Sequence, residues 1–264
     1  MSVQLGAAIA SSLFDRVGAP GTVLLRQGLA AAVLLAVVRP SLLGRSRRDW
    51  LVVCVFGLVL AAMNVCFYEA VARLPLGIAV TIELFGPLGL AASLSRSARE
   101  VAYVVLAAIG VVLLGGATHH LDPAGVAFAL AAAVGWASYI MLSRRIGRHF
   151  HGVDGLALAM VVATLAVAPL GIATGGVRLV EPSALATGFA VAMLSAAVPF
   201  TLELHALRTV GPRTFGVIMS CSPAVAAGMG WVLLSQSLGV IQLAAIGCVV
   251  AASVGTALAT DAST

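Results

Sequence analysis

The sequence predicts an all-α polytopic membrane protein with about ten transmembrane helices, and three observations predict it. Hydrophobic residues make up 61% of the 264 residues and charged residues only 9%, with a mean hydropathy of +1.10. A soluble domain would carry charge on roughly a quarter of its residues. Apolar runs long enough to cross a hydrocarbon core of about 30 Å recur along the chain. They are continuous rather than alternating, which disfavours a transmembrane β-barrel.

Short polar breaks divide the chain into ten predicted helical spans. These are 3–14, 19–38, 50–71, 76–94, 100–117, 123–142, 153–174, 184–206, 212–234 and 239–260. The first is exceptional, because the fourteen residues from Met1 to Phe14 rise only about 21 Å. We therefore expect a shortened first helix and a true start upstream. A cleaved signal peptide fits poorly, since no basic segment precedes the apolar run.

The basic residues predict the orientation of the chain in the membrane. All fifteen are arginine, and eleven of them follow even-numbered spans. Because positive charge gathers in cytoplasmic loops, both termini are expected in the cytoplasm, in the inner or plasma membrane. The net charge of +5 then reflects topology, and no nucleic-acid partner is expected. The four cysteines are dispersed within spans, so no metal site and no cofactor are predicted.

Two halves of the chain repeat one another. The string LAAIG at residues 106–110 recurs at 243–247, and Pro87 and Pro223 lie at nearly the same offset. We therefore predict two repeats, 1–117 and 118–264. A repeat of five spans must insert its second copy upside down, which is typical of secondary transporters with a site near the midplane.

Three of the most polar side chains within the spans lie at one depth. Arg26, Asn64 and Glu83 are each seven residues from the predicted outer end of their span, which is roughly 10 Å of helix. Ionisable groups are costly in a membrane unless paired or hydrated, so this layer is a predicted substrate site.

Two prolines are predicted to break helices beside polar groups. Pro87 cannot donate to the carbonyl of Glu83 four residues earlier. Pro223 frees a carbonyl in the corresponding span, beside Ser222, which is a further predicted substrate-binding residue. Freed carbonyls near the midplane are how such carriers hold polar ligands.

Arg26 and Glu83 leave two interpretations open. They form a buried ion pair that fixes helix packing, or a zwitterion inserts between them, with its carboxylate on Arg26 and its ammonium on Glu83 and Asn64. Glu83 is also a candidate proton carrier.

Other polar residues are weaker candidates. Trp136 and Tyr139 are predicted to line the cavity, although Tyr139 also suits an interfacial belt. Glu203 and His205 suit either the inner interface or a gate and proton exit. Tyr68 lies near the outer surface, where solvation is expected.

Several segments resemble the threonine/homoserine exporter family of the drug/metabolite transporter superfamily, which has EamA-type repeats. They are FDRVGAPGTVLLRQGLA, NVCFYEAVARLPLGIAVTIELFGPL, GWASYIML and LELHALRTVGPRTFGVIMSCSPA. The resemblance covers nearly the whole chain. It implies ten spans, cytoplasmic termini and efflux of small amino acids, driven by proton exchange. Residues that match the family pattern are Arg26, Asn64, Glu83, Trp136, Tyr139, Glu203, Arg213 and Pro223.

The chain departs from the family pattern at two places. Ser222 and Gln236 stand where the family usually has glutamate, so substrate or coupling could differ. The expected partners are a small zwitterionic metabolite, protons and the lipid bilayer, and a homodimer is left open. The alternatives are a drug, metabolite or nucleobase efflux carrier of the same fold, or a non-transporting membrane scaffold. Motifs for an intramembrane enzyme are absent from the sequence, so no catalytic residue is predicted.

Overall fold

A computed structural model describes residues 2–42, 44–94, 102, 105, 106, 109, 121–150, 153–199, 201, 202 and 221–259. Helices dominate these residues, and no strand occurs among them. The helices of the first half are α1 (Ser2–Ser11), α2 (Phe14–Val38), α3 (Arg47–Val71), α4 (Leu76–Glu83) and α5 (Phe85–Leu94). Those of the second half are α7 (Pro123–His149), α8 (Asp154–Gly175), η1 (Gly176–Val180), α9 (Pro182–Ala192), the π-helical turn η2 (Met193–Ala197), α12 (Ser222–Leu234) and α13 (Val240–Ala259).

Four of the described helices are long and apolar enough to cross a membrane. They are α2, α3, α7 and the continuous segment of α8 with η1. The remaining described helices are apolar but shorter. The multi-pass helical class is therefore confirmed, while the predicted span 100–117 lies mostly outside the described residues.

Helix α7 runs seven residues beyond its predicted end at 142. Its last turns carry Arg144, Arg145 and Arg148, so hydropathy falls while the helix continues. Arginine is a good helix former, and basic side chains suit a helix C-terminus. The hydropathy pattern therefore marked where the apolar stretch stops and not where the helix ends.

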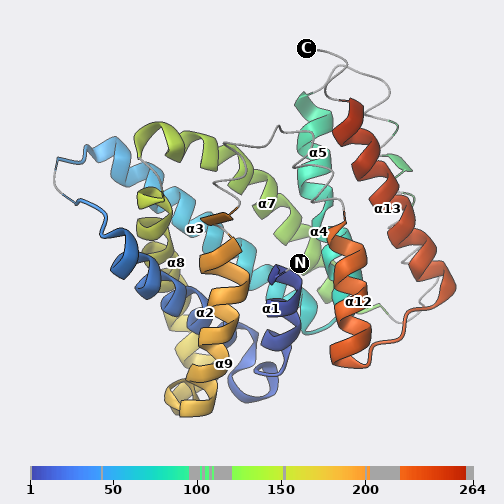
Figure 1. Ribbon diagram of the computed structural model, residues 1–264, viewed down its shortest axis with the longest axis horizontal. Coiled ribbons are helices and arrows are strands. Elements are labelled where there is room, and N and C mark those ends of the chain that lie inside the picture. Colours follow the sequence, from blue (N-terminus) through green and yellow to red (C-terminus); the bar gives the residue numbers. More distant parts are fainter. Residues whose placement is uncertain are drawn as a thin grey trace.

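The helices pack in pairs drawn from the two halves of the chain (Figure 1). Helix α2 lies along α8, α3 lies between α7 and α8, and α4 packs against α12. Glycine allows the closest of these approaches. A Cβ atom on Gly57 of α3 would lie 2.6 Å from the carbonyl oxygen of Ala159 in α8. These pairs bring the middle of the two halves together.

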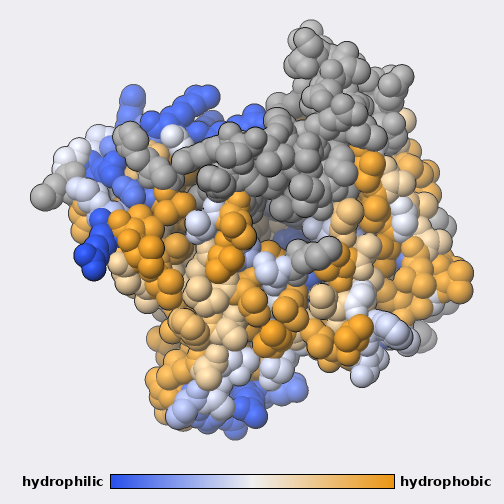
Figure 2. All heavy atoms as spheres, viewed as in Figure 1, coloured by the Kyte–Doolittle hydropathy of each residue, from blue (hydrophilic) through white to orange (hydrophobic). Residues whose placement is uncertain are grey.

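Hydrophilic residues gather at opposite ends of the molecule, with a hydrophobic surface between them (Figure 2). One end, which we call the arginine-rich end, comprises Arg39, Arg45, Arg47, Arg48, Arg144, Arg145 and Arg148. This distribution suits a protein whose middle contacts lipid and whose ends contact water.

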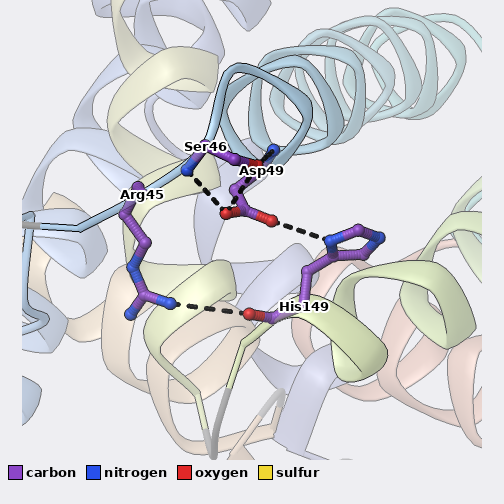
Figure 3. Close-up of polar contacts among 4 residues, drawn as sticks. All are labelled: Arg45, Ser46, Asp49 and His149. Atoms are coloured by element: carbon purple, nitrogen blue, oxygen red, sulfur yellow. Dashed lines mark hydrogen bonds and ion pairs between the residues drawn. The ribbon is translucent and has the colours of Figure 1, made fainter.

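Hydrogen bonds join α3 to the end of α7 at the arginine-rich end (Figure 3). Ser46 caps α3 and exchanges hydrogen bonds with Asp49 in a capping box. The other carboxylate oxygen of Asp49 lies 2.7 Å from Nδ1 of His149. Arg45 stacks over the ring of Phe150 and lies 3.5 Å from the carboxylate of Asp154. The loops before α3 and after α7 are thus held together.

Candidate functional site

A cavity of about 140 Å³ lies between the two halves, and polar side chains from several helices line it. Its lining includes all six predicted substrate-binding residues, namely Arg26, Asn64, Glu83, Trp136, Tyr139 and Ser222. Five different helices contribute them: α2, α3 and α4 carry the three residues of the predicted polar layer, while α7 and α12 carry the others. The structure therefore brings together residues up to 196 positions apart in the chain, from 26 to 222.

Arg26 is the fixed cation of this cavity. Its side chain is only 4% exposed, so the guanidinium is withdrawn from lipid and bulk water. Nε donates to the hydroxyl of Ser195 at 2.7 Å, one terminal nitrogen donates to the carbonyl of Ser195, and the other donates to Oδ1 of Asn64. A planar guanidinium satisfied in this fork has a fixed orientation.

Each acceptor of Arg26 is itself oriented by its own helix. The amide nitrogen of Asn64 donates to the carbonyl of Leu60 at 2.7 Å, which turns Oδ1 towards Arg26. The hydroxyl of Ser195 donates to the carbonyl of Val191 at 2.7 Å, which leaves its lone pairs for Nε of Arg26. The site is thus preorganised by local contacts on α3 and η2.

Ser195 lies in the π-helical turn, four residues before Pro199. Proline has no N–H, so it donates nothing to the carbonyl of Ser195, and that carbonyl accepts from Arg26 instead. Single π-helical turns frequently occur at functional sites. The same spacing separates Glu83 from Pro87, so each half of the chain places a proline four residues after a polar residue that lines the cavity.

Glu83 is the last residue of α4. The chain turns at Leu84, and α5 begins at Phe85, so the helix is interrupted directly before Pro87. The side chain of Glu83 faces the cavity and interacts electrostatically with Arg26. A cation and a carboxylate from different helices therefore line one small cavity.

Aromatic side chains form the apolar side of the cavity. Tyr139 is 4% exposed and stacks on Phe56 with ring centroids 5.3 Å apart. This burial places Tyr139 in the protein interior and away from an interfacial belt. Trp136 lies one helical turn earlier on α7 and also lines the cavity.

Ser222 and Pro223 begin α12. Pro223 lies in the first turn, where a missing N–H has no intrahelical partner to lose. The carbonyl that Pro223 was predicted to free belongs to Met219, which lies outside the described residues. Glu203, His205 and Arg213 lie outside them too, so their roles stay predictions. Among the described residues, no cluster suited to a metal ion occurs.

Sequence reasoning missed three polar residues of the cavity: Gln4, Tyr68 and Ser195. The expectation that Tyr68 is solvated was wrong, because its side chain is 2% exposed. Phe14, at the start of α2, packs against the edge of the Tyr68 ring at 5.8 Å and covers it. The sequence feature that could have identified Ser195 is the proline four residues later. For Gln4, that feature is an amide side chain within an otherwise apolar helix.

These features define a class of protein: a multi-pass helical membrane protein with a cavity lined by charged and polar side chains from both halves of the chain, as membrane carriers have. Known sequences narrow that class. The EamA-like transporter family matches residues 123–258. The chain is 40% identical over 260 residues to the "Threonine/homoserine exporter RhtA" of Escherichia coli (strain K12), covering 97% of this chain and 88% of the relative. The protein of that name from Salmonella typhimurium (strain LT2) matches with the same identity and coverage. The chain belongs to the EamA-like transporter family.

Proposed function

We propose that this protein is a secondary carrier that exports a small zwitterionic amino acid, such as threonine or homoserine, through the cavity around Arg26. The observation that carries the proposal is the presence of Arg26 and Glu83 in the lining of one small cavity. A substrate carboxylate would bind the guanidinium, and its ammonium would bind Glu83. Opposite charges at the two ends of a cavity complement a zwitterion better than an ion of either sign.

The size of the cavity supports a small substrate. An engineered cavity of about 150 Å³ binds benzene, and the volume here is about 140 Å³. Drug-sized ligands occupy pockets of roughly 300–1,000 Å³. The volume therefore favours a metabolite with few non-hydrogen atoms over a drug-like compound. The names of the relatives, which are threonine/homoserine exporters, support the same choice.

The pairing of helices supports an inverted repeat of residues 1–117 and 118–264. In this repeat α1 corresponds to α7, α2 to α8, α3 to α9 with η2, and α4 to α12. The contact of α3 with α7 therefore has a counterpart in the contact of α9 and η2 with α1, and both contacts occur. The pairs α2 with α8 and α4 with α12 each join two corresponding helices, as a two-fold relation between the halves requires. In such a repeat, rocking of one half against the other alternately exposes the central cavity.

Proton exchange is the coupling we propose. Glu83 is the one carboxylate among the described residues of the cavity lining. A proton and a substrate ammonium would compete for it, so release of one would accompany binding of the other. We place the arginine-rich end in the cytoplasm of an inner or plasma membrane by the positive-inside rule, with both termini on that side.

Replacement of Glu83 by Gln tests the proposal. In proteoliposomes, wild-type protein should exchange labelled threonine for unlabelled threonine and accelerate efflux under a pH gradient. Glu83→Gln keeps the shape of the side chain but neither carries a proton nor pairs an ammonium. We expect exchange to fall by roughly 10-fold or more and the effect of the pH gradient to disappear.

Glu69→Gln is the matched control, because Glu69 pairs with Arg73 near the end of α3 and does not line the cavity. It should behave as wild type. Absence of threonine and homoserine exchange in the wild-type protein would contradict the proposed substrate. Unaltered exchange in Glu83→Gln would contradict the site.

A further inference from the structure

Two fully buried side-chain atoms of residues that line the cavity have no hydrogen-bond partner. They are Oε1 of Gln4 on α1 and the hydroxyl of Tyr68 on α3. Gln4 is 7% exposed and Tyr68 is 2% exposed, so bulk water does not solvate them. Burying a polar group without a partner is destabilising, and most buried polar atoms in proteins have a partner.

Their neighbours in the cavity differ from them. Asn64 and Ser195 each bond both their own helix and Arg26. Among the described lining residues, fully buried side-chain atoms without a partner are therefore confined to Gln4 and Tyr68. A buried polar group without a protein partner usually binds an ordered water or another small molecule.

Tyr68 lies beside Arg26, and the helix that carries Gln4 packs against the turn that carries Ser195. The guanidinium carbon of Arg26 lies 5.7 Å from the centroid of the Tyr68 ring. The rings of Phe14 and Phe67 pack edge-to-face with the Tyr68 ring, at centroid distances of 5.8 Å and 5.7 Å, and hold it in place. Helix α1, which carries Gln4, approaches the η2 turn so closely at Gly6 that an added Cβ would lie 2.7 Å from Cβ of Ser195. Ser195 in turn binds Arg26.

We propose that Gln4 and Tyr68 recognise a hydroxyl group on the side chain of the transported amino acid. This inference rests on the proposed function and adds the determinant of specificity. A hydroxyl donates one hydrogen bond and accepts up to two. It would donate to Oε1 of Gln4, which only accepts, and accept from the phenol of Tyr68. A methyl group in the same place would leave both groups unpaired.

The hydroxyl explains the pair better than the substrate ammonium does. Every amino acid carries an ammonium, and Glu83 already offers it a charged acceptor. An ammonium also cannot accept from the phenol. Sites built around a hydroxyl discriminate strongly against isosteres that lack it.

Competition with isosteres tests the inference. Proteoliposomes exchange labelled threonine, and unlabelled threonine or valine competes; valine has a methyl group where threonine has its hydroxyl. Homoserine and norvaline form a second pair of the same kind. For wild-type protein, the half-inhibitory concentration should be at least roughly 10-fold higher for valine than for threonine. Tyr68→Phe and Gln4→Leu should each reduce that ratio by roughly 3–10-fold, with inhibition by valine little changed.

Gln27→Leu is the matched control. Gln27 is also buried with an unpartnered Oε1, but it does not line the cavity, so the ratio should stay at the wild-type value. Tyr68→Phe removes one oxygen atom and decides the question even if Gln4→Leu fails to fold.

A wild-type ratio near one, with threonine exchange intact, would overturn the hydroxyl assignment and leave amino-acid export standing. Variants that keep the wild-type ratio would overturn the roles of Gln4 and Tyr68. Equal weakening of threonine and valine would overturn recognition of the hydroxyl in favour of the ammonium. Absence of exchange in the wild-type protein would overturn the proposed function itself.

Discussion

At the scale of single residues, the site depends on how Arg26 is held. Its three described hydrogen bonds go to Ser195 and Asn64, on different helices. Pro199 makes one of them possible, because the carbonyl of Ser195 has no N–H donor at that position. The guanidinium is thus both a link between the two halves and the group that would bind a substrate carboxylate.

We expect Arg26→Lys to weaken transport although it preserves the charge. A lysine ammonium cannot span Asn64 and both acceptors of Ser195 in one plane. Loss of charge-assisted hydrogen bonds should raise the KM for threonine exchange by roughly 10-fold or more. Arg16→Lys is the control, because Arg16 is exposed and its side chain donates a hydrogen bond to the surface hydroxyl of Ser183, away from the cavity. An unchanged KM in Arg26→Lys would show that a positive charge at this position is enough for substrate binding and that the guanidinium geometry is not needed.

At the scale of helices, the interruption between α4 and α5 sets where Glu83 lies. The helix ends at Glu83, and two residues after the turn Gly86 meets the backbone of α7 at Ala133. A Cβ at position 86 would overlap the carbonyl of Ala133. Glycine is therefore required there for α5 to pack against α7 and to hold Glu83 at the cavity.

We expect Gly86→Ala to destabilise the protein. Overpacking a close helix contact costs about 1–3 kcal/mol, so the midpoint of thermal unfolding in detergent should fall by roughly 4–10 °C. Gly89→Ala, one turn away on α5, is the control, because an added Cβ there meets no atom within 4 Å. It should leave the midpoint unchanged or slightly higher. Equal midpoints for the two variants would argue against this contact.

At the scale of the whole molecule, the charged ends differ in composition and in their contacts. The arginine-rich end holds α3 and α7 together through Asp49 and His149 (Figure 3). At the opposite end, Gln236 follows α12, and its side-chain oxygen accepts from the backbone N–H of Leu76 at 3.0 Å. The residue that departs from the family pattern thus caps α4 and lies outside the cavity lining.

Labelling of single cysteines tests the orientation. After replacement of the four native cysteines, Ser41→Cys and Val177→Cys each place one thiol at opposite ends, at exposed positions. If the arginine-rich end is cytoplasmic, a membrane-impermeant maleimide should label position 177 in intact cells and position 41 only after permeabilisation. Labelling of position 41 in intact cells would reverse the proposed orientation.

The sequence by itself determined the helical membrane class and most helix positions, and it predicted the polar layer of Arg26, Asn64 and Glu83, which line one cavity. These follow from local properties, namely hydropathy, helix length and the rarity of polar groups in apolar spans. Only the tertiary structure decided that Ser195, Gln4 and Tyr68 join that layer. Ser195 depends on a contact with Arg26 across 169 positions, and Tyr68 is buried because Phe14 covers it. Such contacts form only when helices far apart in the sequence pack together. They depend on which helix faces meet, and a local sequence pattern does not contain that information.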